Sequence, residues 1–151
     1  MTEIGIIDES LKIIENDDLK LVLNLGIEKS KRFYYKIYDK YNNYVGNCGI
    51  RLSDDYKDDV LGNIEYEIFE EYRGNNYSQK ACKLLTFVAL HYNVKELSIT
   101  ASPKNIASNK TIQNLGARFI EIKKVPENSI LYKSNKQVNM YNWNIESEKK
   151  I

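Results

Sequence analysis

The sequence GNIEYEIFEEYRGNNYSQKACKLLTFVALH, residues 62–91, predicts a strand, a tight turn and a long helix in direct succession. In its first part, apolar residues alternate with glutamates, which is the period-2 pattern of a β-strand over Asn63–Phe69. Its last part carries apolar residues at every third or fourth position, which predicts an amphipathic helix over Tyr77–His91. The apolar face of this helix consists of Ala81, Leu84, Leu85 and Val88.

The turn between strand and helix, Arg73–Ser78, has the composition of an anion-binding loop. Unpaired N–H groups and the positive end of the helix dipole meet at a helix N-terminus, so oxygen-rich anions bind there. Gly74 and Ser78 are small, and Asn75 and Asn76 enter the left-handed backbone region at low cost. The alternative is an ordinary polar turn before a core helix.

The pattern Arg73-x-x-Asn76-x-Ser78 resembles the Gln/Arg-x-x-Gly-x-Gly/Ala signature of the GCN5-related N-acetyltransferase (GNAT) superfamily. In that family the amides of this loop hold the pyrophosphate of acetyl coenzyme A. The flanking residues are similar to the branch that includes ribosomal-protein N-terminal and spermidine acetyltransferases. Asn76 and Ser78 depart from the signature, which usually has glycine at the first position and glycine or alanine at the second. The resemblance implies that acetyl-CoA is bound by Arg73, Gly74, Asn75, Asn76, Tyr77 and Ser78.

A second segment, NIASNKTIQNLGARF at residues 105–119, is similar to the family's Asn-x-x-Ser and Leu-Gly-Phe motif. The resemblance implies that Asn105 bonds the pantetheine arm and that Ser108 lies near the thioester sulfur. The alternative for both residues is a helix N-cap, which requires no ligand. Many members carry a tyrosine general acid seven residues after this asparagine, where this chain has Ile112. A thiol with a pKa of about 8.5 leaves as thiolate with little help, so Ser108 or solvent is expected to supply the proton.

The reaction that the resemblance implies is direct transfer of the acetyl group to a primary amine of a small molecule or a protein N-terminus. An amine of the lysine type has a pKa of about 10 and must lose a proton before it attacks. We expect Glu67, and after it Glu65, to face the reaction slot and act as the base. The alternative is that both carboxylates face solvent or pair with lysine or arginine. Backbone groups at Ile68 and Phe69 are expected to bind the pantetheine amide.

Composition limits the other interpretations. The chain has 151 residues and a net charge of +1 with acids and bases mixed, which predicts a single domain over 1–151 and argues against nucleic-acid or membrane partners. There is no pattern of a signal peptide, and Cys48 and Cys82 are isolated thiols, so a reduced cytoplasmic protein is expected. His91 is the only histidine and has no metal-ligand spacing around it, so no metal is expected.

The rest of the chain predicts a mixed α/β domain with a mostly antiparallel sheet. The predicted strands are Leu11–Glu15, Phe33–Asp39, Tyr44–Leu52, Asn63–Phe69, Glu96–Ala101, Phe119–Val125 and Val138–Ile145. Further predicted helices are Asp18–Leu25, ended by Gly26, and Asn105–Leu115, ended by Gly116. We expect a turn at 40–43, a loop at 53–61 and a frayed tail at 146–151.

This order of elements is that of the GNAT fold. The resemblance therefore implies a central sheet of six to seven strands with helices on both faces. It also implies a splayed parallel pair formed by the strands at Asn63–Phe69 and Glu96–Ala101.

Two other functions remain open. The departures at Asn76, Ser78 and Ile112 fit a non-catalytic module that binds acyl-CoA. The tyrosine-rich run Phe33–Tyr44 either covers both faces of a hairpin, lines a pocket or forms a dimer contact. The last of these fits an interaction domain or a homodimer.

Overall fold

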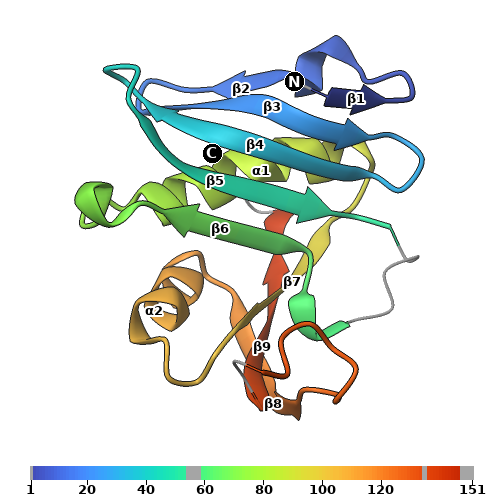
Figure 1. Cartoon of the computed structure of the whole chain (residues 1–151), viewed down its shortest axis with the longest axis vertical. Coiled ribbons are helices and arrows are strands. Elements are labelled where there is room, and N and C mark those ends of the chain that lie inside the picture. Colours follow the sequence, from blue (N-terminus) through green and yellow to red (C-terminus); the bar gives the residue numbers. More distant parts are fainter. Residues whose placement is uncertain (1, 54–58, 134–135, 147–151) are drawn as a thin grey trace.

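The computed structural model describes residues 2–53, 59–133 and 136–146, which form two β-sheets and two α-helices (Figure 1). The large sheet has the strand order β1-β3-β4-β5-β6, with β2 also paired to β3. Its strands are β1 Thr2–Ile4, β2 Ile13–Glu15, β3 Leu19–Ile27, β4 Arg32–Asp39, β5 Tyr44–Arg51 and β6 Ile64–Ile68. The small sheet has the order β7-β9-β8, and its strands are β7 Glu96–Ala101, β8 Arg118–Lys124 and β9 Gln137–Asn144.

The α-helices are α1, Tyr77–His91, and α2, Ile106–Asn114. Short 3-10 turns lie at η1 Glu9–Leu11, η2 Asp59–Leu61 and η3 Glu70–Tyr72. Each described strand pair is antiparallel except β1 with β3, which confirms the expected mixed, mostly antiparallel sheet. Part of the predicted loop at 53–61 and most of the tail at 146–151 lie outside the described residues. Among the described helices, none is both long enough and apolar enough to cross a membrane.

The helix predicted over Asp18–Leu25 is wrong, because these residues belong to β3. Leu19, Leu21 and Leu23 are at most 1% exposed and alternate with less buried residues, so a period-2 core pattern outweighs the helix-start signal. That signal came from Asn16, whose Oδ1 instead accepts backbone N–H bonds in the turn from β2 to β3, at 2.9 and 3.0 Å. Gly26 accordingly lies inside β3 and ends no helix.

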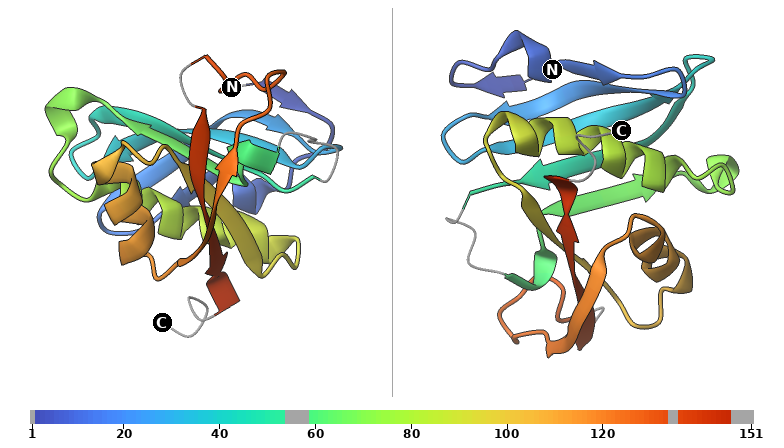
Figure 2. Two further views of the ribbon diagram at one scale, coloured as in Figure 1. Left: turned by 90° about the horizontal axis from the view of Figure 1, so that it is seen from below. Right: turned by 180° about the vertical axis from the view of Figure 1, so that it is seen from behind.

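Because a strand replaces the N-terminal helix, one face of the large sheet stays open. Helix α1 packs on the other face, where Leu85 and Val88 are fully buried in the core (Figures 1 and 2). Trp143 of β9 is buried in the same core and connects the small sheet to it. The described helices leave the face opposite α1 uncovered, where a second helical layer was expected.

Strands β6 and β7 meet near their beginnings and diverge towards their ends, which opens the fold. The backbone N–H of Asn63 donates to the carbonyl of Ser98 at 2.6 Å, and the N–H of Ser98 donates to Asn63 Oδ1 at 2.7 Å. Beyond this junction the two strands belong to different sheets (Figure 1). The expected splayed pair is therefore present, and the chain leaving its diverging ends leads into α1 and α2.

Candidate active site

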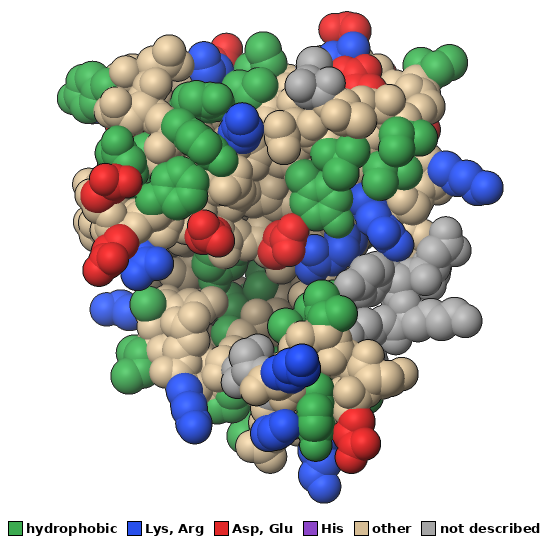
Figure 3. Space-filling view, in the orientation of Figure 1, with side chains coloured by type: hydrophobic (Ala, Val, Ile, Leu, Met, Phe, Trp, Pro, Cys, Tyr) green, Lys and Arg blue, Asp and Glu red, His purple; other side chains and the backbone are tan. Residues whose placement is uncertain are grey.

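A cleft of about 490 Å³ lies between the end of β6, the loop before α1 and the first part of α2, and it brings both sequence motifs together. Figure 3 shows the surface hollowed between the large sheet and the half of the molecule that holds α2. The predicted site residues that line the cleft are Glu67, Ile68, Arg73, Gly74, Asn76, Tyr77, Ser78, Asn105 and Ser108. The predicted residues Glu65, Phe69 and Asn75 do not line it. The loop before α1 and the beginning of α2 therefore form one site.

The loop before α1 has the backbone of an anion-binding cradle. Gly74 has φ +91°, and Asn76 has φ 59° and ψ 25°, so Asn76 adopts the left-handed conformation that suits the glycine usual at this position. The side chain of Asn76 makes no cap hydrogen bond, and no acidic residue occupies the first turn of α1. The positive end of the helix dipole is therefore not neutralised by a side chain of this turn, which favours an anionic ligand.

Two side chains fix the shape of this loop. Arg73 Nε donates to the carbonyl of Ile68 at 3.1 Å and ties the loop to the end of β6. Asn75 Nδ2 donates to the carbonyl of Tyr72 at 2.9 Å. The N–H of Phe69, one of the backbone groups expected near pantetheine, donates to the carbonyl of Val45 in β5 at 2.9 Å. The carbonyl of Ile68 keeps a second lone pair for a ligand.

Asn105 caps α2, which is the structural alternative expected for it. Its Oδ1 accepts the backbone N–H of Ser108 at 3.0 Å. One turn later, Asn109 Oδ1 accepts from the Tyr141 hydroxyl at 2.6 Å and from Asn139 Nδ2 at 2.9 Å, both on β9. These bonds hold the first turn of α2, and with it one wall of the cleft, against the small sheet.

Tyr66 is a site residue that the sequence did not indicate. Its hydroxyl lies 2.6 Å from Ser108 Oγ, and the residue lines the cleft together with both motifs. Burial raises the pKa of Tyr66 to about 12, and its hydrogen bond with Ser108 offsets only part of that rise. In the sequence Tyr66 occupies an apolar position of the β6 alternation, so its pattern indicated core packing. The only feature of the sequence that could have indicated a site role for Tyr66 was its hydroxyl group, which valine or isoleucine at an apolar strand position would lack.

The two predicted bases differ in their surroundings. Glu65 Oε2 lies 3.2 Å from Arg51 Nη1, and the Arg51 side chain is 7% exposed while that of Glu65 is 53% exposed. Arg51 Nη2 also donates to the carbonyls of Leu61 and Gly62. Glu65 thus compensates a buried cation, which is the pairing that the sequence left open. The side chain of Glu67 makes no hydrogen bond or ion pair with the described residues, although its backbone pairs with Asn47 of β5.

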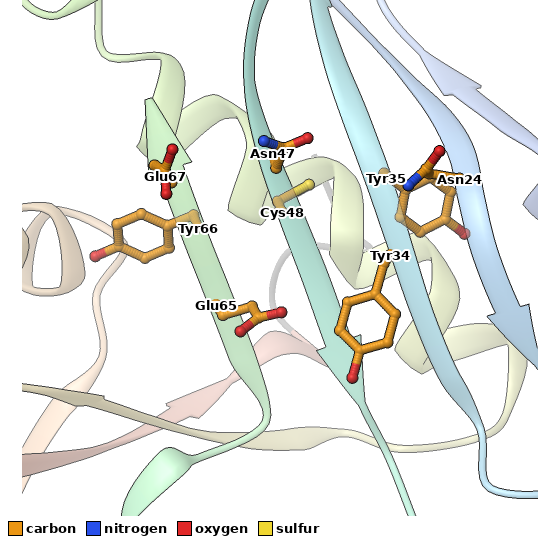
Figure 4. A pocket seen from close by; sticks show the side chains of 8 residues that line it. All are labelled: Asn24, Tyr34, Tyr35, Asn47, Cys48, Glu65, Tyr66 and Glu67. Atoms are coloured by element: carbon orange, nitrogen blue, oxygen red, sulfur yellow. The ribbon is translucent and has the colours of Figure 1, made fainter. Parts of the chain in front are cut away.

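A second cavity, of about 320 Å³, lies on the open face of the large sheet. Figure 4 shows Glu65, Glu67, Asn47 and Asn24 around it, with the ring of Tyr66 directed away from them. Glu67 and Tyr66 line both this cavity and the cleft, so the two spaces meet at β6. No group of three or more histidine, cysteine, aspartate or glutamate side chains fit to hold a metal occurs in the described residues.

Comparison with solved structures finds acetyltransferases of low sequence identity. A Vibrio cholerae protein assigned as a ribosomal-protein-serine acetyltransferase has a TM-score of 0.67 and 14% identity, covering 87% of this chain and 97% of its own. A Salmonella typhimurium acetyl transferase that modifies the N-terminal serine of ribosomal protein L7/L12 has a TM-score of 0.63 and 17% identity, with coverages of 79% and 67%. A microcin C7 self-immunity acetyltransferase in complex with acetyl-CoA and AMP has a TM-score of 0.62 and 19% identity, with coverages of 78% and 63%.

At these identities the likeness shows the fold, and a search of curated proteins found no match. The family follows from the sequence, because residues 9–118 match the family model of the acetyltransferase (GNAT) domain. That match contains β6, α1, α2 and hence all predicted residues of the cleft. The chain therefore belongs to the GNAT acetyltransferase family.

Proposed function

We propose that this protein is an N-acetyltransferase that transfers the acetyl group of acetyl-CoA to a primary amine of a small molecule or a protein N-terminus by direct attack. The observation that supports it most is the single cleft formed by the left-handed loop at Gly74–Asn76 and the start of α2. Two buried free thiols, Cys48 and Cys82, fit a reducing compartment, so we also propose a cytoplasmic enzyme.

The coenzyme would occupy this cleft with its pyrophosphate at the first turn of α1. That turn offers main-chain N–H groups and the positive end of the helix dipole, and it contains no acidic residue that would repel an anion. Ile68, whose carbonyl retains a lone pair, and Asn105, at the cleft wall, would contact the pantetheine arm. The thioester would then lie towards the junction of the two cavities at β6.

The acceptor amine would enter from the open face of the large sheet. There the cavity beside Asn24, Asn47 and Glu67 offers amide and carboxylate oxygens, which bind an ammonium group and accept its proton. Glu67 is our choice of base, because Glu65 is held by Arg51 whereas Glu67 makes no such contact. The nitrogen then attacks the thioester carbonyl, the C–N bond forms, and the C–S bond breaks.

A non-catalytic acyl-CoA-binding module is the second candidate. The observation that favours it is Ile112, which is fully buried where many family members carry a tyrosine acid. Such a module would bind acetyl-CoA and release no thiol with any amine.

Calorimetric titration of acetyl-CoA tests both candidates, with Asn76→Glu as the perturbation and Asn76→Gln as its matched control. Glu and Gln impose the same backbone strain, so only the added negative charge separates them. Micromolar binding that survives Asn76→Gln and disappears in Asn76→Glu would support the cradle. Equal loss in both variants, or no binding by the wild type, would contradict it.

Thiol release from acetyl-CoA in the presence of spermidine or of peptides with N-terminal serine or alanine then separates enzyme from module. Release that depends on the amine supports the proposed transfer. Tight binding without release by any amine supports the module.

A further inference from the structure

Helix α2 offers no acid to the leaving sulfur at the position where many family members carry a tyrosine. Ile112 is 0% exposed and belongs to the hydrophobic core, so α2 presents no phenol at this position. Other residues that carry a hydroxyl group line the cleft: Tyr66, Tyr72, Tyr77, Ser78, Ser108 and Thr111. Of these residues, Tyr66 alone also borders the second cavity, so it lies in β6 at the junction where thioester and acceptor would meet.

Tyr66 reaches this place from a different element. It lies in β6 between Glu65 and Glu67, and the strand's period-2 geometry sends its ring to the opposite side. Figure 4 shows that ring directed away from the residues of the open face. Its hydroxyl is held 2.6 Å from Ser108 Oγ, across the space between β6 and α2.

The two hydroxyls leave one hydrogen to spare. Each carries a single hydrogen, and one hydrogen bond between them uses one of the two. When Ser108 donates to the phenol oxygen, the hydrogen of Tyr66 is available to a group in the cleft. The other acceptor near the phenol, the carbonyl of Ser108 at 3.5 Å, is too distant to hold it firmly.

We propose that Tyr66 donates a hydrogen bond to the coenzyme sulfur as the C–S bond breaks, in place of the tyrosine that α2 lacks, and that Ser108 positions it. This inference rests on the proposed function. As the amine nitrogen forms its bond to the carbonyl carbon, the electron pair of the C–S bond passes to sulfur, and the phenol stabilises that charge. The amine proton leaves through Glu67, and solvent protonates the thiolate after release.

The phenol keeps its own proton during this step. With the pKa of Tyr66 raised to about 12, full transfer to a thiolate whose conjugate acid has a pKa of about 8.5 is unfavourable, so the phenol acts as a hydrogen-bond donor. Its contribution to turnover should therefore be nearly constant between about pH 6 and 9, because the phenol stays protonated throughout this range.

The test measures the pKa of the thiol of bound CoA, by thiolate ultraviolet absorbance, in the wild type and in Tyr66→Phe. A donor at the sulfur favours the thiolate, so the wild type should show a thiol equilibrium shifted about 10- to 100-fold towards thiolate relative to the variant. This readout requires CoA and no acceptor amine. An equal thiol pKa in both proteins, at saturating CoA, overturns the inference.

Calorimetry with CoA keeps the possible failures apart. If the wild type does not bind CoA, the proposed function fails and this inference fails with it. If the wild type binds and Tyr66→Phe binds equally well, an unchanged thiol pKa refutes only the role of Tyr66. If Tyr66→Phe loses affinity and the thiol pKa of its saturated complex still equals that of the wild type, the phenol is structural and the inference is again refuted.

A double-mutant cycle tests the positioning role of Ser108. Ser108→Ala should lower acetyl-CoA turnover several-fold in the wild-type background and have no further effect in Tyr66→Phe, because Ser108 acts through the phenol. Tyr66→Phe itself should lower kcat about 10- to 100-fold, and this loss should not vary with pH. Independent, additive losses would contradict the arrangement.

Discussion

Replacing Glu67 by glutamine should remove most turnover at neutral pH and leave the stability unchanged, whereas Glu65→Gln should keep the turnover and lower the stability. The two residues lie two positions apart in β6 on the same side of the strand. Each variant removes one negative charge and keeps the side-chain size. They are therefore matched controls for one another, and their difference reports only the contacts of each carboxylate.

The magnitudes follow from these contacts. At pH 7 an amine of pKa about 10 is only about 0.1% neutral, and a positioned base is worth about 100- to 10,000-fold. Glu67→Gln should therefore lower kcat/KM by at least about 100-fold. Glu65→Gln removes the partner of an arginine whose side chain is 7% exposed, although Glu65 itself is 53% exposed. Because one partner is buried and the other exposed, Glu65→Gln should lower the free energy of unfolding by about 1–2 kcal/mol, between the costs of losing a surface pair and a buried pair.

The assay combines thiol release at pH 7 to 9 with urea unfolding of both variants. Without its base the enzyme depends on the neutral amine, so the turnover of Glu67→Gln should rise about tenfold per pH unit, more steeply than that of the wild type. Acetyl-CoA affinity should not change. Full activity in Glu67→Gln, or a large activity loss in a stable Glu65→Gln, would refute the assignment of base and structural counter-ion.

Three further predictions concern stability and reactivity. Gly62→Ala should lower the free energy of unfolding in urea by about 2–4 kcal/mol, because Gly62 has φ +70° and an added Cβ would lie 2.8 Å from the carbonyl oxygen of Ser98. Gly74 has φ +91° but open space around it, so Gly74→Ala should cost only about 1 kcal/mol. Burial alone would raise the pKa of Asp39, but hydrogen bonds from the Asn43 side chain and from the N–H groups of Asn43 and Tyr41 lower it below its ordinary value. A lowered folded-state pKa stabilises the fold above about pH 4 and this contribution is lost on further acidification, so wild-type stability should fall more steeply there than that of Asp39→Asn. Burial raises the pKa of Cys82 to about 12 and that of Cys48 well above its ordinary value, so a thiol reagent should count no reactive cysteine in the native protein and two in urea.

The helices and strands that the sequence predicted correctly are those in which local pattern and tertiary burial agree. The α1 bounds, Tyr77–His91, match because its apolar stripe faces the sheet along its whole length. Over Leu19–Ile27 the local helix-start signal and the tertiary burial disagreed. An asparagine and two aspartates before an apolar run are typical of a helix start, but the alternating leucines pair with β4 and bury in the core. The helix-start signal describes only the first turn of a segment, whereas pairing with β2 and β4 on either side decides its structure, so the open sheet face was not predicted.

The candidate site was predictable where backbone conformation determines it and less so where side chains cross between elements. Asn76 was expected to adopt the left-handed conformation, and it does. The contact of Tyr66 with Ser108 joins residues 42 positions apart, and the pairing of Glu65 with Arg51 depends on β5. Both contacts depend on strand register and on the splay between the two sheets. The homodimer, one of the alternatives for the tyrosine-rich hairpin, stays a hypothesis, which sedimentation at several concentrations would test.

One strand separates the two halves of the proposed chemistry. Because side chains alternate along β6, Tyr66 points to the coenzyme side and Glu67 to the open face, and a slip of one residue would exchange them. The register that prevents this is fixed by β5, where Gly46 lies opposite Ile68 and Asn47 opposite Glu67. A Cβ on Gly46 would collide with the carbonyl oxygen of Glu67 and the Cα of Ile68, so β5 and β6 approach this closely only with glycine there. Gly46 lines neither cavity, yet it determines which side of the strand receives the phenol and which the carboxylate.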